Sequence, residues 1–90
     1  MEVIRKLTIR NDLGLHARAA AKIVALASGY KSEIFIRKGK NEVNASSILS
    51  IPTLSCPKGT EIEARIVGED AAEFMERLSL MFEQRFGEGR

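Results

Sequence analysis

The stretch Gly14-Leu15-His16-Ala17-Arg18-Ala19-Ala20-Ala21-Lys22 holds the only histidine of the chain, at the junction between an expected strand and an expected helix. The alanine-rich run favours a helix over residues 17–28, with His16 at its start. The first backbone N–H groups of a helix lack internal partners and carry partial positive charge, so they attract anions. An imidazole at this point, with a guanidinium two residues on, can accept a phosphoryl group. The alternative is a surface or capping histidine without chemistry.

The residues on both sides of this stretch alternate in the manner of strands. Apolar side chains fall on one face of each segment, with Arg5 as the exception in the first. Turns are expected at Lys38-Gly39-Lys40-Asn41 and at Pro57-Lys58-Gly59. The expected strands are residues 2–9, 32–37, 42–45 and 60–67.

The remaining segments predict helices. Residues 47–54 form a short apolar segment interrupted by Pro52, and a longer helix begins at Asp70. Asp70 and Glu73 have the spacing of a capping box. The apolar stripe that follows is expected to be core, and it consists of Ala71, Phe74, Met75, Leu78, Met81 and Phe82. The order βαββαβα predicts an α+β fold in two layers, an open-faced sandwich. We expect a four-stranded antiparallel sheet with three helices on one face.

Size and composition favour one ordinary globular domain over residues 1–90. The chain is 44% hydrophobic and 29% charged, with 14 basic and 12 acidic side chains and a net charge of +2. This balance does not indicate a nucleic-acid partner, and few aromatic side chains are available for stacking on bases. Cys56 is the only cysteine, so no internal disulfide is possible. No signal peptide or membrane span is recognisable, which favours a cytoplasmic location without membrane insertion.

The whole chain resembles the HPr family, the histidine-containing phosphocarrier proteins of the bacterial phosphotransferase system. The resemblance rests on Gly14-Leu15-His16-Ala17-Arg18, on Val43-Asn44-Ala45-Ser46-Ser47-Ile48-Leu49 and on Lys58-Gly59-Thr60-Glu61-Ile62, together with length and element order. The preceding segment, Asn11-Asp12-Leu13-Gly14, resembles the same segment in the family branch that serves nitrogen-related phosphotransferase systems. Whether the relay ends in sugar uptake or in regulation stays open.

The resemblance implies that His16 accepts the phosphoryl group on Nδ1. A helix N-terminus disfavours the imidazolium, so we expect a neutral ring with a lone pair for attack. The amides of Ala17 and Arg18 and the planar fork of the Arg18 guanidinium would then hold the phosphate. Position 19 departs from the family, since most members have proline there. Ala19 keeps the helix and gives a less rigid first turn.

The second motif implies regulation and docking. Ser47 aligns with a serine that a dedicated kinase phosphorylates in some members, and its alternative role is to cap the second helix. Ile48, Leu49 and Ile51 belong to the family's partner-facing surface, with Leu49 the residue expected to be exposed or, alternatively, second-layer core. Lys22 could steer acidic partners or be simply solvated.

These residues together predict a stoichiometric phosphocarrier, not an enzyme, with no cofactor and no metal. Its partners would be enzyme I, enzyme IIA proteins and possible serine kinase or phosphorylase enzymes, and we expect a monomer. The alternative function is a regulatory interaction protein controlled through Ser47, with little or no relay activity.

Overall fold

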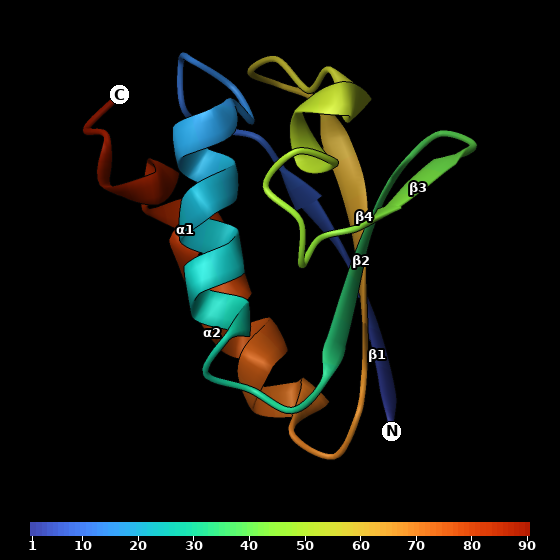
Figure 1. The fold of residues 1–90 in the computed structure, drawn as a ribbon. Helices are drawn as coiled ribbons and strands as arrows, with labels where there is room; N and C mark the ends of the chain where they lie inside the picture. The colour runs from blue at the N-terminus through green and yellow to red at the C-terminus, as the bar shows by residue number, and fades with distance from the viewer.

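The computed structural model describes residues 1–90 and contains a four-stranded antiparallel sheet backed by two α-helices (Figure 1). The strands are β1 (Glu2–Thr8), β2 (Glu33–Lys38), β3 (Asn41–Asn44) and β4 (Glu61–Val67), in the spatial order β1-β4-β2-β3. The helices α1 (Ala17–Ala27) and α2 (Ala71–Glu83) cover one face of the sheet. The expected α+β architecture and antiparallel sheet are therefore confirmed, with strand ends within one or two residues of the prediction.

The core lies between the sheet and the helices. Alternation along β2 and β4 turns Ile34, Ile36, Ile62 and Ile66 inward, each at most 1% exposed. The predicted stripe on α2 is also core: five of its six members are buried and Met81 packs against them. Neither α-helix is long and apolar enough to cross a membrane.

The predicted third helix is wrong. Residues 47–54 form a turn followed by a short 3-10 helix, η1 (Ile51–Leu54). The N–H groups of Ser50 and Thr53 bond to the carbonyls three residues before them, at 3.2 Å each, in the pattern of a 3-10 turn. Pro52 fixes its own φ and has no N–H, so it cannot contribute to an α-helical ladder. The segment therefore packs beside α1 without becoming a third α-helix.

The expected capping box at α2 is also wrong. Asp70 is the N-cap residue, but its side chain makes no capping hydrogen bond. Its carboxylate instead accepts hydrogen bonds from the N–H groups of Lys31 (2.8 Å) and Ser32 (3.0 Å) and from the Ser32 hydroxyl. Asp70 thus fastens the loop before β2 to the start of α2.

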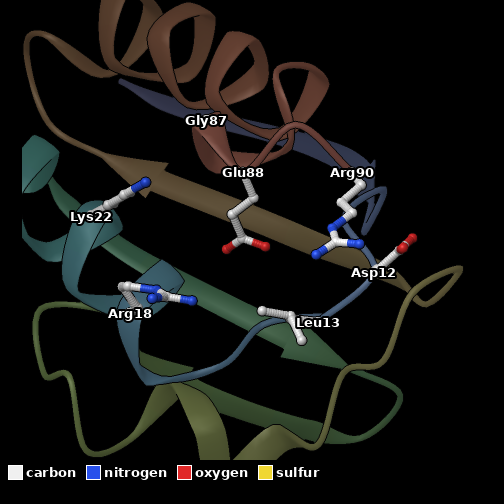
Figure 2. Close-up of a pocket in the computed structure, with 7 residues that line it drawn as sticks. All are labelled: Asp12, Leu13, Arg18, Lys22, Gly87, Glu88 and Arg90. Atoms are coloured by element: carbon white, nitrogen blue, oxygen red, sulfur yellow. The ribbon is translucent and has the colours of Figure 1, made fainter.

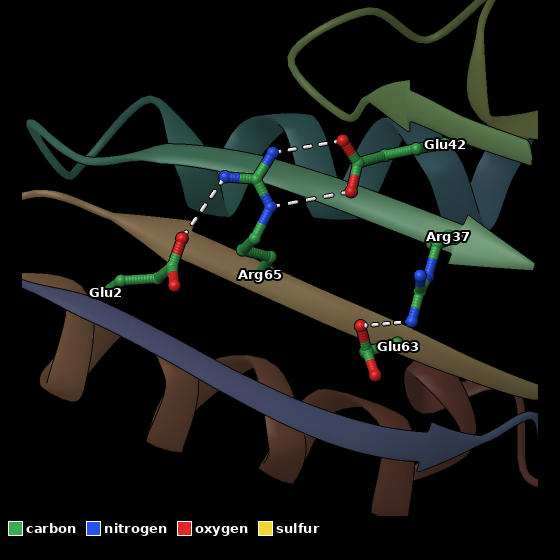
Figure 3. Close-up of polar contacts among 5 residues, drawn as sticks. All are labelled: Glu2, Arg37, Glu42, Glu63 and Arg65. Atoms are coloured by element: carbon green, nitrogen blue, oxygen red, sulfur yellow. Dashed lines mark hydrogen bonds and ion pairs between the residues drawn. The ribbon is translucent and has the colours of Figure 1, made fainter.

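Arg5, the exception in the first strand, faces the helices and is satisfied there. Its guanidinium donates to the Ser79 hydroxyl and the Glu76 carboxylate, both at 2.9 Å. The other face of the sheet is open and carries paired charges (Figure 3). Arg65 lies between Glu42 (3.0 Å) and Glu2 (3.4 Å), and Arg37 contacts Glu63 at 2.6 Å. Such exposed pairs add little stability, but they keep this face polar.

Candidate phosphoryl-acceptor site

His16 is the N-cap residue of α1. Its backbone is extended, with φ −80° and ψ 177°, and its carbonyl accepts the Ala20 N–H at 2.9 Å. Its ring Nδ1 accepts the N–H of Arg18 at 3.1 Å. The imidazole therefore satisfies one of the unpaired donors of the helix N-terminus, in the place that a serine or aspartate side chain often takes. About a quarter of the side chain (23%) is exposed.

Gly14 fixes the approach of the chain to His16. Its φ is +72°, and a β-carbon on it would lie 2.5 Å from the carbonyl oxygen of Cys56. The same carbonyl accepts the Leu15 N–H at 2.9 Å, and Leu15 is buried. Only glycine combines this backbone conformation with so close an approach. Leu15 is thus held against the loop that follows η1. Burial raises the pKa of the Cys56 thiol in that loop and keeps the thiol protonated.

The other nitrogen of His16 contacts Glu88, a residue that the sequence did not single out. Nε2 of His16 lies 2.5 Å from Oε2 of Glu88. Oε1 of Glu88 accepts a hydrogen bond from Nδ2 of Asn11 at 3.0 Å. Burial raises the pKa of the Glu88 carboxyl, but the hydrogen bonds from His16 and Asn11 and the nearby charges outweigh burial and hold this pKa below its ordinary 4.5. Glu88 is therefore a carboxylate at neutral pH.

The segment that carries Glu88 folds back against α1. After α2 the chain forms a 3-10 turn, η2 (Arg85–Gly87), in which all three residues have positive φ. Phe86 is 2% exposed and packs on Phe82, with ring centroids 5.0 Å apart. Lys22 Nζ donates a hydrogen bond to the Phe86 carbonyl. Lys22 thus holds the chain end in place, a contact that sequence reasoning did not anticipate.

A pocket opens beside these contacts (Figure 2). Its lining residues are Asp12, Leu13, Arg18, Lys22, Gly87, Glu88 and Arg90. Figure 2 shows the Glu88 carboxylate extending into the space between Arg18 and Arg90. Asp12 pairs with Lys58 at 2.9 Å, and the hydrogen bond and charge of Lys58 lower the pKa of Asp12. The pocket is rimmed by the cations Arg18, Lys22 and Arg90, and the Glu88 carboxylate extends into it.

Two predicted phosphate contacts lie at the open end of α1. Ala17 and Arg18 are exposed. The Ala17 N–H has no hydrogen-bond partner, and the Arg18 guanidinium makes no hydrogen bond or ion pair, so both are available to an anion. The Arg18 N–H already points at His16.

The residues of the second motif divide between surface and core. Ile48 is 41% exposed and Leu49 is 84% exposed, so the expected exposure of Leu49 is confirmed. Ile51 is fully buried, and its predicted place on a docking surface is wrong because, as the first residue of η1, it belongs to the core. Ser47 is half-buried, and its hydroxyl does not cap a helix because no helix begins there.

Comparison with known proteins places the chain among phosphocarriers. Residues 3–84 match a family model described as "PTS HPr component phosphorylation site". The phosphocarrier protein HPr of Xylella fastidiosa (strain Temecula1) is 46% identical over 83 residues, which cover 92% of this chain and 93% of the relative. That of Neisseria meningitidis serogroup A is 42% identical over 85 residues, covering 94% and 96%. The crystal structure of HPr-C-His from Thermoanaerobacter tengcongensis is similar with a TM-score of 0.90 at 36% identity, covering 96% of this chain and 97% of that one.

Proposed function

This chain belongs to the HPr family of phosphocarrier proteins of the phosphotransferase system, and we propose that it carries the phosphoryl group on Nδ1 of His16. The observation that carries the proposal is the placement of a partly exposed imidazole at the N-cap of α1, beside the exposed guanidinium of Arg18. The relatives are named as phosphocarriers, which favours a relay over a regulatory protein in which His16 does no chemistry.

The transfer at His16 needs one nucleophilic lone pair and no proton movement. Nδ1 accepts a backbone N–H from Arg18, so this nitrogen is unprotonated and its lone pair faces the helix N-terminus. When a phosphoryl group arrives, that lone pair forms the N–P bond. The bond between phosphorus and the donor breaks, and its electron pair returns to the donor.

The helix start supplies charge stabilisation at the moment of transfer. The Arg18 N–H that now contacts Nδ1 and the unpartnered Ala17 N–H can both donate to phosphoryl oxygens. The Arg18 guanidinium adds a charge-assisted contact through its planar fork. The two backbone donors are placed by the helix before the reaction, which is the arrangement that lowers a barrier without reorganisation of the backbone.

The partners follow from the family. Enzyme I is the expected donor and an enzyme IIA protein the expected acceptor, each contacting the surface around His16 and the exposed Ile48 and Leu49. The chain acts in this scheme as a monomer. Small interfaces suit the role because rapid hand-off needs rapid dissociation.

Serine phosphorylation at Ser47 stays a prediction. A phosphate beside Ile48 and Leu49 would put about two negative charges next to an apolar docking surface. A Ser47→Asp variant should then be phosphorylated at His16 more slowly at low enzyme I concentration. A rate equal to the parent's would remove the regulatory role.

The relay itself is tested with phosphoenolpyruvate labelled in its phosphoryl group and a purified enzyme I. One acid-labile, base-stable phosphate is expected on the parent and none on His16→Asn. Asparagine is chosen because it is also a good N-cap and keeps α1 intact, whereas alanine would cost about 1 kcal/mol. Labelling of a folded His16→Asn variant, or no labelling of the parent, would overturn the proposal.

A further inference from the structure

We propose that Glu88 is a positioning residue that keeps the proton of the His16 ring on Nε2 and thereby leaves Nδ1 as the nucleophile. The effect on phosphoryl transfer rests on the proposed function, whereas the tautomer follows from the contacts of the ring alone. Glu88 lies 72 positions from His16 in the sequence and reaches it from the segment that follows α2.

The hydrogen bonds on the two ring nitrogens assign the tautomer. Nδ1 faces the Arg18 N–H, which can only donate, so Nδ1 must present a lone pair. Nε2 faces a carboxylate oxygen at 2.5 Å, which can only accept, so Nε2 must carry the hydrogen. Either contact alone would favour this form, and the two together leave the other neutral tautomer with two mismatched contacts.

Asn11 holds the Glu88 carboxylate in place. Its Nδ2 donates to Glu88 Oε1 at 3.0 Å and to the Gly14 carbonyl at 2.7 Å. Asn11 is 0% exposed, and its Oδ1 is buried without any hydrogen-bond partner. Turning the amide over would set Oδ1 against two acceptors. The fold therefore tolerates an unpaired buried oxygen, which is unfavourable, and in return directs the two amide hydrogens of Asn11 at Glu88 and at the loop before His16.

The chain on both sides of Glu88 is also fixed. Phe86 is anchored in the core, and its carbonyl is held by Lys22. Two residues beyond Glu88, the Arg90 carbonyl accepts the Asp12 N–H at 3.1 Å. Only 11% of the Glu88 side chain is exposed. The carboxylate is thus held by His16 and Asn11, and the backbone on both sides of Glu88 is held by Lys22 and Asp12.

The consequence for transfer is electronic and geometric. A carboxylate that accepts the Nε2 hydrogen increases electron density on Nδ1 and fixes the plane of the ring, as a carboxylate partner does for other reactive histidines. During transfer Nδ1 forms the bond to phosphorus, the bond to the donor breaks, and the proton stays on Nε2. The phosphorylated ring keeps the same contact with Glu88.

The test uses Glu88→Gln, with Glu83→Gln as the charge-matched control. Glutamine has one acceptor oxygen for two donors, so either His16 or Asn11 faces an amide nitrogen. Glu83 is exposed at the end of α2 and its carboxylate makes no hydrogen bond or ion pair. Because the chain has a single histidine, the imidazole nitrogens of ¹⁵N-histidine-labelled protein all report on His16.

Long-range ¹H–¹⁵N NMR of the neutral ring should find the Nε2–H tautomer dominant in the parent and in Glu83→Gln. In Glu88→Gln the excess of this tautomer should be smaller, because only the Arg18 N–H still favours it. The kcat/KM for phosphorylation by enzyme I should fall about tenfold in Glu88→Gln only. An unchanged ratio of the two tautomers in Glu88→Gln overturns the inference, whatever the rate of transfer. A changed tautomer with an unchanged rate overturns it as well. Failure of the proposed function would appear separately, as label retained on His16→Asn or absent from the parent.

Discussion

Gly14 approaches Cys56 so closely that a β-carbon at position 14 would lie 2.5 Å from the Cys56 carbonyl oxygen, nearer than real β-carbons come to backbone atoms. Two residues later the chain reaches His16. The geometry of the site therefore depends on a residue that carries no chemistry.

Gly14→Ala should destabilise the fold by about 2 kcal/mol or more, through the positive φ and the displacement of the Cys56 backbone. Gly39→Ala is the matched control, since Gly39 has a φ of +59° with no atom within 4 Å of its added β-carbon. Gly39→Ala should lower the free energy of unfolding by only about 1 kcal/mol. Urea unfolding measures the free energy of unfolding of both variants. Equal losses would show that the close approach to Cys56 adds nothing to the cost of a side chain at position 14.

Ala19→Pro should change the free energy of unfolding by no more than about 1 kcal/mol and could stabilise the chain. Ala19 is the third residue of α1, and its N–H makes no backbone hydrogen bond. Ala20→Pro is the contrast: its N–H donates to the His16 carbonyl at 2.9 Å, and its loss should cost about 3 kcal/mol. Because Ala19 is fully buried, a loss in Ala19→Pro well beyond 1 kcal/mol would mean that the core has no room for the ring.

Arg18→Ala should reduce kcat/KM for phosphorylation at least about tenfold, because the guanidinium meets charge that develops only in transfer. Its stability should hardly change, since Arg18 is exposed and a cation at a helix N-terminus is unfavourable by about 0.3–1 kcal/mol. Arg77→Ala, on the exposed side of α2, controls for the lost charge. Equal rates in the two variants would make Arg18 a bystander.

Leu49→Ser should raise the KM of enzyme I for this protein several-fold and leave kcat unchanged. Truncating an interface side chain typically costs about 1 kcal/mol or more of binding free energy. Leu49 is 84% exposed, so stability should be nearly that of the parent. Ile4→Ser serves as the control, because Ile4 is 51% exposed on β1 and turned away from the helices. If both variants bind enzyme I as the parent does, the docking surface lies elsewhere.

Asp70 should make the fold acid-sensitive. The hydrogen bonds from the Ser32 hydroxyl and from the N–H groups of Lys31 and Ser32 lower the pKa of Asp70 below its ordinary 3.8. A carboxyl with a lower pKa in the folded than in the unfolded state stabilises the fold above the unfolded value, and this contribution is lost as pH falls through the folded value. The stability difference between parent and Asp70→Asn should be constant above about pH 5 and shrink below pH 3.8. Urea melts across this range measure it, and a difference that persists undiminished at about pH 2 would contradict the assignment.

Local pattern in the sequence was enough for the sheet, for the core stripe of α2 and for a helix that starts beside His16. Alternation and helical spacing report directly on which side chains are buried, so Ile34, Ile62 and Phe74 were placed correctly. Pattern was insufficient where two local preferences compete. Apolar residues at 48–51 favoured a helix, but Pro52 and the surrounding serines left only a 3-10 turn.

The rest could not be predicted because it depends on contacts between distant segments. Asp70 has the spacing of a cap, yet its carboxylate accepts the N–H groups of Lys31 and Ser32, which lie 38 or more positions away in the sequence. Glu88 follows a glycine and precedes another, with no periodicity to mark it. Its contact with His16 exists only because Phe86 anchors the turn after α2. The buried Asn11, with one orphaned oxygen, is the structural sign of that contact.

The return of the chain end to His16 has a practical consequence for anyone who attaches a probe. Figure 1 places residue 90 near the beginning of α1, whereas residue 1 lies at the opposite end of the molecule. A purification tag, fluorophore or fusion partner joined after Arg90 would start within the cationic rim of the pocket and pull on the segment that carries Glu88. The same addition before Met1 would extend from the start of β1, at the other end of the molecule. A probe for kinetic work should therefore be attached before Met1.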